Sequence, residues 1–271
     1  MTQAMHADRP GELIRQWRRR RRISQLDLAL QAEVSQRHLS FVESGRSMPS
    51  REMILRLTDH LAVPLRQRNR ILAAAGLAPG FGERALEHTS LKPALETVQQ
   101  VLAGHEPYPA LAVDRHWNML MANAAVAPLL QVVADPALLE PPVNVLRLSL
   151  HPAGLGPHIL NAGQWREHLF HRLRTQIDAS ADPVLEQLLQ ELAGYPGGGA
   201  AQAFEDAGGA SAAMIAVPLR LEIGGRTLSF ISTVTVFGTP LEVTLSELAI
   251  ETLFPADGDT AVALREMSGA A

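Results

Sequence analysis

Segment 24–44 (SQLDLALQAEVSQRHLSFVES) constrains the fold of this chain more than any other part of the sequence. Ser24 and Ser35 can each cap the start of a helix, and Asp27 favours the positive end of the first helix dipole. Ala29 is small, which allows a second helix to cross the first one closely. The segment therefore predicts two short helices joined by a tight turn.

The second of these helices has an apolar inner side and a polar outer side. Leu39 and Val42 are three residues apart, so both face a core on one side of the helix. In the major groove, glutamine can pair bidentately with adenine, and arginine with guanine. The residues that face outward near the helix start are Gln36, Arg37, His38 and Ser40. This pattern predicts a helix-turn-helix that contacts double-stranded DNA, although a generic helical bundle with a polar face shares its caps and periodicity.

Three further helices are expected around this pair. Apolar periodicity predicts them over 11–21, 50–61 and 64–76, the last of which ends at a glycine. Arg46 follows the second helix of the pair in a loop, where it is well placed to contact a phosphate. The five arginines of 18–22 fit a phosphate contact or a solvated helix face better than a targeting signal.

Residues 10–76 resemble the XRE (Cro/cI-type) helix-turn-helix family in their five-helix order and in the helix start at Ser35 and Gln36. By this resemblance Gln25 would brace the contact with the DNA backbone, and Gln36 would be the leading base-contacting residue. Arg46, with Gln25 and Ser35, would fix the register on phosphates. The resemblance implies an all-α DNA-binding domain.

One position departs from that family. Glu33 stands in the turn between the two helices, where the family often has glycine. A left-handed backbone at this position would cost a non-glycine residue about 1 kcal/mol. The departure leaves the turn geometry open and the motif intact.

Composition excludes several classes of protein. The chain has 271 residues, enough for two domains, and no cysteine, which excludes disulfides, thiol catalysis and cysteine-bound zinc. It has neither a long apolar stretch nor a signal-peptide pattern, so we expect a cytoplasmic protein without a membrane partner. Residues 1–76 hold 14 Arg and Lys and 7 Asp and Glu, a net charge of +7, whereas 77–271 hold 10 and 21, a net charge of −11. A basic head on an acidic body fits a chain whose head alone contacts phosphate.

The rest of the chain combines helices with strands. After a linker at 77–90, helices are expected over the ranges 91–104, 124–133, 137–149, 163–179 and 182–194. Strands are expected over the ranges 108–114, 117–123, 216–223, 226–237 and 240–253. Gly224-Gly225 marks a hairpin turn between two of them, and the Gly- and Ala-rich residues 195–212 are expected to form a loop. Strands at both ends with helices between them predict an α+β domain with an antiparallel sheet.

This second domain resembles the MmyB-like ligand-binding domain, a PAS-like module often placed behind an XRE head. The resemblance rests on Asp114, Trp117, Asn123, the helix segment 165–174 and the terminal strand pair up to Pro255. It implies a sheet cupped around an apolar cavity, with fatty-acid-like ligands. The expected domains are a helix-turn-helix domain at 1–76, a linker at 77–90, a PAS-like domain at 91–259 and a tail at 260–271.

An apolar cavity needs inward apolar side chains and a few polar anchors. Strand alternation would place Trp117, Met119 and Met121 on one face of the sheet. Arg174, His168 or Asn123 could hold a carboxylate head group. Each candidate has an alternative role in a filled core. The candidate ligand-binding residues are Trp117, Met119, Met121, Asn123, His168, Arg174, Phe230 and Val234.

No catalytic or metal-binding pattern accompanies these residues. His168 and His171 are three residues apart beside Glu167, but no HExxH or related spacing goes with them. The glycines of 197–199 lack the lysine of a phosphate loop, and no G-x-S-x-G segment is present. We therefore expect no enzyme, no metal and no cofactor, unless a fatty acid or similar apolar molecule is bound.

Three hypotheses follow, of which the third is an enzyme fused to a DNA-binding domain, which an ordered catalytic triad or a metal centre would support. In the first, the chain is a transcription regulator that binds a palindromic operator as a homodimer, and its second domain senses a small apolar or fatty-acid-like ligand. In the second, this domain serves only for dimerisation or for docking of a protein partner. A small molecule retained in native mass spectrometry would favour the first.

Overall fold

The computed structural model describes residues 9–196, 217–237 and 242–269. These residues form two units, the first made mainly of the chain up to Ala85 and the second mainly of the chain from Leu86 onward. Each unit has its own buried apolar core.

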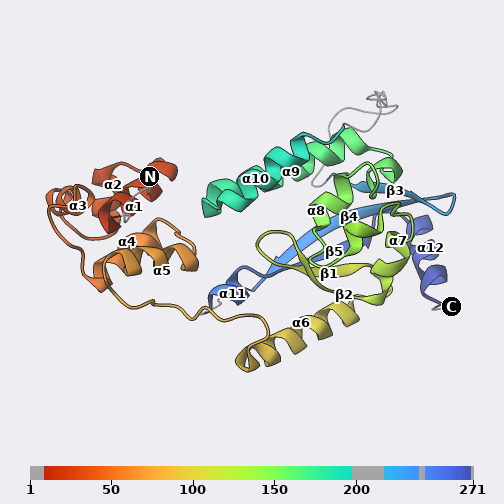
Figure 1. Ribbon diagram of the computed structural model, residues 1–271, viewed down its shortest axis with the longest axis horizontal. Coiled ribbons are helices and arrows are strands. Elements are labelled where there is room, and N and C mark those ends of the chain that lie inside the picture. The colour runs from red at the N-terminus through yellow and green to blue at the C-terminus, as the bar shows by residue number, and fades with distance from the viewer. Residues whose placement is uncertain (1–8, 197–216, 238–241, 270–271) are drawn as a thin grey trace, which may run out of the picture. The chain divides into compact units, whose positions relative to one another are not determined.

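The part of the first unit up to Ala85 holds five helices, as the sequence predicts (Figure 1). Ser24, Ser35 and Ser50 each cap a helix by accepting a hydrogen bond from the backbone N–H three residues later, at 3.1, 3.1 and 3.2 Å. The inward faces of the helices share one core, in which Leu39 and Ile71 are fully buried. The helices are α1 (Pro10–Arg20), α2 (Gln25–Gln31), α3 (Gln36–Glu43), α4 (Arg51–His60) and α5 (Leu65–Ala74).

Left-handed backbone and close contact shape the connections of this unit. Glu33, between α2 and α3, has a φ of +54°, so a non-glycine residue occupies the left-handed conformation. Gly45 after α3 and Gly76 after α5 have φ values of +75° and +72°, which glycine adopts without steric cost. At Gly11 the constraint is space, because a Cβ there would lie 1.9 Å from the carbonyl oxygen of Val42. Helices α1 and α3 therefore cross in contact.

The second unit is built on a five-stranded antiparallel sheet of order β2-β1-β5-β4-β3. The predicted Gly-Gly hairpin joins β3 to β4: Gly224 and Gly225 have φ values of +59° and +74°, and Ile223 pairs with Arg226 across the turn. The strands are β1 (Ala110–Val113), β2 (Met119–Ala122), β3 (Leu219–Ile223), β4 (Arg226–Val236) and β5 (Ala249–Pro255).

Helices cover both faces of this sheet (Figure 1). On one face, Ala112 and Ile250 pack against Val98 of α6. On the other face, Phe230 packs into a larger core with Leu173 of α9. The α+β architecture is therefore confirmed. The helix α11 (Val243–Ser246) and the end of α9 from Asp178 on belong to the first unit. The helices of the second unit are α6 (Lys92–Gly104), α7 (Ala127–Leu130), α8 (Val145–Leu150), α9 (Ala162–Ser180) up to Ile177, α10 (Pro183–Ala193) and α12 (Gly258–Ser268).

The segment 137–149, expected as one helix, forms two. A 3-10 helix covers Pro136–Leu139, and α8 begins only at Val145. Pro141 and Pro142 lie between them. Proline has no backbone N–H to donate and its ring clashes with the preceding turn, so the prediction of a continuous helix was wrong.

The last strand begins later than expected. Of the range 240–253, residues 240–241 lie outside the described part of the chain. The four-residue helix α11 follows, and Glu242, directly before it, caps its start. Glu242 Oε2 accepts a hydrogen bond from the Leu245 N–H at 2.9 Å, which favours this helical turn over a strand. The strand β5 then runs to Pro255.

The residues expected as a tail, 260–271, begin inside the helix α12. Asp257 caps this helix by accepting a hydrogen bond from the Thr260 N–H at 2.7 Å, and Gly269 ends it with a φ of +69°. The loop expected at 195–212 lies outside the described residues from position 197 on.

Candidate functional site

The start of α3 presents polar side chains to solvent. Gln36 and Arg37 are exposed. His38 and Ser40 are half-buried on the same helix, whose inward residues are fully buried. The Ser35 hydroxyl is occupied by the cap, since it accepts a hydrogen bond from the His38 N–H at 3.1 Å. In helix-turn-helix proteins this end of the second helix meets base edges in the major groove.

Glu43, buried at the end of α3, ties three helices together. Its carboxylate accepts hydrogen bonds from Arg18 of α1, through Nε at 2.6 Å and Nη2 at 2.8 Å. It also accepts one from Gln25 Nε2 of α2 at 2.7 Å. The hydrogen bonds between Arg18 and Glu43 raise the pKa of the Arg18 guanidinium. Gln25, predicted to brace the backbone contact, is therefore held in place by the helix that carries the base-contacting candidates.

The arginines of 18–22 do not form a single solvated surface. Arg18 points inward to the ion pair just described. Arg21 donates through Nε and Nη2 to two carbonyl oxygens at the end of α4, each at 3.0 Å. Arg19 and Arg22 are exposed. Two of the five side chains thus stabilise the fold and are not available as a phosphate contact or a solvated face.

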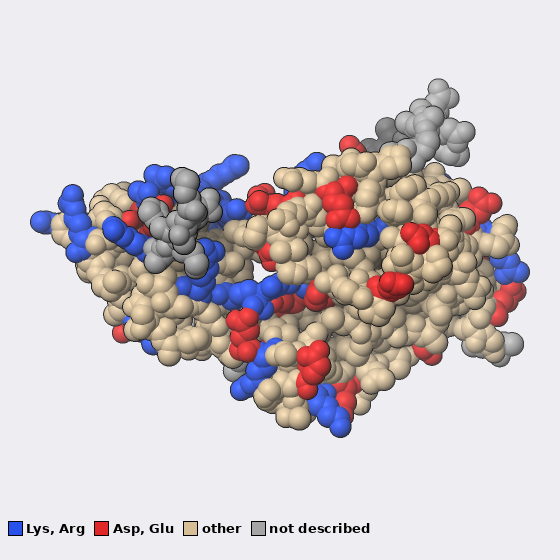
Figure 2. Space-filling view, in the orientation of Figure 1, with Lys and Arg blue, Asp and Glu red and all other residues tan. Residues whose placement is uncertain are grey.

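Two predicted DNA-contacting arginines lie against one aromatic ring. The guanidinium carbons of Arg37 and Arg46 are 5.5 and 5.9 Å from the ring centroid of Phe41. Both arginines remain exposed. Figure 2 shows basic side chains gathered over the N-terminal helices, where every basic Arg or Lys position of residues 1–76 is an arginine, in agreement with their net charge of +7. A basic surface of this kind attracts the phosphate backbone of a nucleic acid.

In the second unit, a cavity of about 80 Å³ lies between the sheet and the helices α7, α8 and α9. Most of its wall is apolar, and only two lining residues, Ser149 and Glu251, carry polar side chains that are not aromatic. The lining residues are Leu111, Met119, Val126, Leu129, Leu130, Val145, Leu146, Leu148, Ser149, Leu155, Trp165, Leu169, Leu219, Leu221, Glu251 and Leu253. Such a wall is suited to a small apolar molecule.

Glu251 links this wall to the turn between β1 and β2. Its Oε1 accepts hydrogen bonds from Arg172 Nη1 at 3.0 Å and from Ser232 Oγ at 2.5 Å. The Arg172 guanidinium lies 4.8 Å from the ring centroid of Trp117, and Trp117 Nε1 donates to Gln176 Oε1 at 2.7 Å. A continuous set of contacts therefore runs from the cavity through α9 to that turn.

Trp165 closes another side of the cavity. Its Nε1 donates to Ser149 Oγ at 3.0 Å, and its ring stacks on His168 with centroids 5.2 Å apart. Burial lowers the pKa of His168, and the nearby positive charge of Arg172 lowers it further. The imidazole therefore stays neutral at pH values where an exposed histidine begins to take up a proton.

The structure disperses the other predicted ligand-binding residues. Met119 lines the cavity. The Trp117 ring packs against the guanidinium of Arg172, which pairs with Glu251. Phe230 is fully buried in the core. Val234 is exposed near the end of β4, and Arg174 is exposed on α9.

A bulge explains why Met119 and Met121 do not share a face, as strand alternation predicted. Val113 pairs with Met119, but its neighbour Ala112 pairs with Met121, so the register shifts by one residue. The extra residue, Leu120, sends Met121 to the α6 side of the sheet, where both contact the smaller core. The expectation of a common face was therefore wrong.

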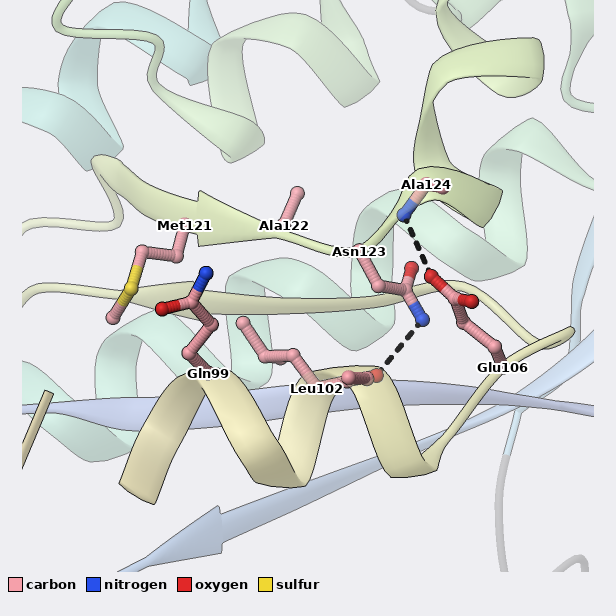
Figure 3. Close-up of a pocket in the computed structure, with 8 residues that line it drawn as sticks. Gln99, Leu102, Glu106, Met121, Ala122, Asn123 and Ala124 are labelled. Atoms are coloured by element: carbon pink, nitrogen blue, oxygen red, sulfur yellow. Dashed lines mark hydrogen bonds between the residues drawn. The ribbon is translucent and has the colours of Figure 1, made fainter. Parts of the chain in front are cut away.

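Met121 and Asn123 line a separate hollow of about 320 Å³ between α6 and the end of β2 (Figure 3). Asn123 Nδ2 donates to the carbonyl oxygens of Leu102 at 3.1 Å and Tyr108 at 2.8 Å. Its Oδ1 accepts a hydrogen bond from the Ala110 N–H at 3.0 Å. Because both N–H groups hold the fold together, we regard the smaller apolar cavity as the better candidate site.

Sequence reasoning missed Glu251, Arg172 and Trp165 as residues at the cavity. One signal was present: Glu251 is the single charged residue in the apolar run 248–254 (LAIETLF). Arg172 and Arg174 are two residues apart on one helix, and only the packing shows which of them turns toward the sheet.

The described part of the chain contains no group of three or more His, Asp or Glu side chains that could hold a metal ion. His171, the neighbour of His168 one helical turn on, is exposed. None of the helices within 9–196, 217–237 and 242–269 is long and apolar enough to span a bilayer.

A helix-turn-helix unit with a basic surface, followed by an α+β unit with an apolar cavity, defines a DNA-binding regulator with a separate ligand-binding domain. Comparison with protein families agrees with this class. A family model described as the MmyB-like transcription regulator ligand binding domain matches residues 94–267, and one described as helix-turn-helix matches residues 14–67. The chain belongs to the MmyB-like transcription regulators. A search of curated proteins found no match.

Proposed function

We propose that this regulator binds a palindromic operator as a homodimer and that a small apolar molecule in the cavity alters the pairing of its DNA-binding units. The observation that carries the proposal is the polar start of α3, where Gln36 and Arg37 are exposed on a helix whose inner face is buried. A ligand shifts such an equilibrium only if it binds the two arrangements with different affinity. The direction of the transcriptional response depends on which arrangement it favours.

In this proposal the outward residues of α3 and the residues beside it contact different parts of the DNA. Gln36, Arg37, His38 and Ser40 contact base edges, and Arg46 contacts a phosphate beside them. Gln25 fixes the register, supported by its hydrogen bond to Glu43. Ser35 contributes through its backbone, because its hydroxyl serves the cap of α3.

A binding-site selection from random duplexes at fixed salt tests the base contacts. We expect Gln36→Ala to relax the preference at one base pair of each half-site by about 1–3 kcal/mol, because the bidentate contact is lost. Gln31→Ala, a change of the same size at the exposed end of α2, should leave the preference unaltered. An unchanged preference in Gln36→Ala would remove Gln36 from the set of base-contacting residues.

The ligand part of the proposal rests on the apolar wall of the cavity, to which Met119 contributes. A fatty-acid-like ligand stays a proposal, and the volume of about 80 Å³ admits only a short piece of an acyl chain unless α7 or α8 moves. Native mass spectrometry of the protein isolated from cells tests retention of a small molecule.

A second function is favoured by apolar side chains that the sheet leaves exposed. Val234 and Val236 of β4 are 44% and 61% exposed. Exposed apolar residues on a strand are typical of an interface, so the second unit would then serve for dimerisation or for docking of a protein partner. In that case native mass spectrometry would find a dimer or complex without a retained small molecule.

A further inference from the structure

The charged group that the cavity offers to a ligand is a hydrogen-bond acceptor. Both hydrogen bonds that Glu251 accepts, from Arg172 and from Ser232, reach the same carboxylate oxygen, Oε1. No residue in the described part of the chain donates to Oε2. Glu251 is nonetheless 8% exposed and lines the cavity.

The second polar lining residue is a neutral hydroxyl with one partner. Ser149 Oγ accepts a hydrogen bond from Trp165 Nε1 at 3.0 Å and keeps its O–H as a donor. The rest of the lining is aliphatic or aromatic. Of the two carboxylate oxygens of Glu251, Oε2 accepts no hydrogen bond from the described residues, and an ionised oxygen forms stronger hydrogen bonds than a hydroxyl does.

This placement selects against a ligand whose head is a carboxylate. Such a head beside Glu251 would bring two like charges together in a weakly screened, apolar space. Arg172 offsets the charge of one carboxylate, and that carboxylate is already Glu251. A donor head group, by contrast, would give Oε2 a partner, and a hydrogen bond to an ionised group is stronger than one between two neutral groups.

The size of the cavity limits the apolar part of the ligand. Its volume is about 80 Å³. A dry cavity of about 150 Å³ lined by Leu, Ile and Phe holds benzene, so this cavity takes a smaller apolar body without rearrangement. A chain of about four carbons is a suitable probe.

We propose that the cavity binds a small apolar molecule whose polar end is a hydrogen-bond donor, an amine or a hydroxyl, that donates to Glu251 Oε2. This inference rests on the proposed sensing function, keeps the apolar chain of a fatty-acid-like ligand and replaces its carboxylate head with a hydrogen-bond donor. It places the head group between the apolar lining and the ion pair of Glu251 with Arg172. Binding then acts on the contacts that lead to Trp117.

The test compares butylamine, butan-1-ol and butyrate, which share one hydrocarbon chain and differ in the head group. Each is titrated into the full-length protein at constant pH and ionic strength, and binding is followed by NMR shifts of side chains around the cavity. We expect butylamine and butan-1-ol to bind about tenfold or more tightly than butyrate. Butyrate binding as tightly as the amine and the alcohol would overturn the assignment.

A variant then assigns the preference to one residue. Glu251→Gln keeps the shape of the side chain and removes its charge, so we expect the advantage of butylamine over butyrate to fall about tenfold. Glu222→Gln, the same change at an exposed position of β3, should keep the advantage. If Glu251→Gln and Glu222→Gln reduce the advantage of butylamine over butyrate equally, Glu251 is not the residue that binds the head group. Should Glu251→Gln fail to fold, the comparison of head groups on the unmodified protein still decides.

Xenon separates a failure of this inference from a failure of the proposed function. Xenon occupies dry apolar cavities and has no head group. If xenon binds but the amine and the alcohol bind no better than butyrate, a sensing cavity exists and the donor assignment is overturned. If neither xenon nor any butyl compound binds, the cavity is not a ligand site, and both proposals fall.

Discussion

Glu33 carries a backbone cost that its side chain does not offset. Its φ of +54° lies in the left-handed region, where the Cβ of an L-residue crowds the following carbonyl oxygen. The side chain is exposed and makes no hydrogen bond or ion pair with any residue within the described ranges. The turn between α2 and α3 is therefore formed in spite of Glu33 and is held by the packing of the two helices.

We expect Glu33→Gly to raise the free energy of unfolding by about 0.5–1 kcal/mol. Relief of the left-handed strain, about 1–2 kcal/mol, exceeds the extra entropy that glycine loses on folding. Urea unfolding of the full chain, followed by circular dichroism, measures the change.

Gly76→Ala is the control, because it replaces glycine with a non-glycine residue at another left-handed position. Gly76 has a φ of +72°, and a Cβ there would meet nothing within 4 Å, so backbone strain is the main effect. This variant should lower the free energy of unfolding by about 1 kcal/mol. A loss of stability in Glu33→Gly would mean that the glutamate side chain stabilises the turn in a way that its contacts do not reveal.

At the same scale, the sequence predicted which residues of α3 face outward but not the partners of single arginines. Apolar spacing fixes the inner face of a helix, so the exposure of Gln36 and Arg37 follows from Leu39 and its neighbours. Arg18 and Arg21, however, stand in a run of identical residues. Only the position of the buried Glu43 decides which arginine turns inward, and that position depends on how α1 and α3 cross.

At the scale of elements, the crossing of α1 and α3 depends on the absence of a side chain at Gly11. The backbone of α1 there approaches the carbonyl of Val42 so closely that a Cβ would lie 1.9 Å from its oxygen. The same crossing aligns Arg18 with Glu43. The orientation of α3, and with it the surface that we propose to contact bases, therefore depends on this contact.

Gly11→Ala should destabilise the helical unit by about 1–3 kcal/mol or more, because the methyl group must push α1 away from α3. Gly163→Ala is the control: Gly163 lies near the start of α9, is exposed, and has no atom within 4 Å of an added Cβ. There alanine should stabilise by up to about 1 kcal/mol through its helix propensity. Thermal unfolding of both variants measures the contrast, and equal effects would show that the close crossing does not limit stability.

The elements themselves were largely predictable, because periodicity and caps are local signals. The five N-terminal helices and the Gly224-Gly225 hairpin appear as expected. The helix α12 was missed, although Asp257 and Gly269 are typical start and stop signals. The bulge at Leu120, opposite Ala112 and Val113, gives no signal in the local sequence, because a shift of register is decided by the partner strand. The face assigned to Met121 was wrong for that reason.

At the scale of the whole molecule, the separation of charge limits which surface approaches DNA. Residues 1–76 carry a net charge of +7, and residues 77–271 carry −11. An acidic body is repelled by the phosphates that attract the basic head. We therefore expect the contacts with phosphate, and the salt dependence that they cause, to come from the helical unit alone.

The salt dependence of operator binding tests this division and counts the bound copies. Each phosphate contact contributes about 0.9 to the slope of log K against log salt concentration. Arg46→Ala should therefore reduce the slope by about 0.9 if one copy binds and by about 1.8 if a homodimer binds. Arg265→Ala, which changes an exposed arginine of α12 in the acidic body, should leave the slope unchanged.

Fluorescence anisotropy of a labelled duplex between low and physiological salt gives both slopes. A fall in slope with Arg265→Ala equal to that with Arg46→Ala would place the body on the DNA, and no fall with Arg46→Ala would remove Arg46 from the phosphate contacts.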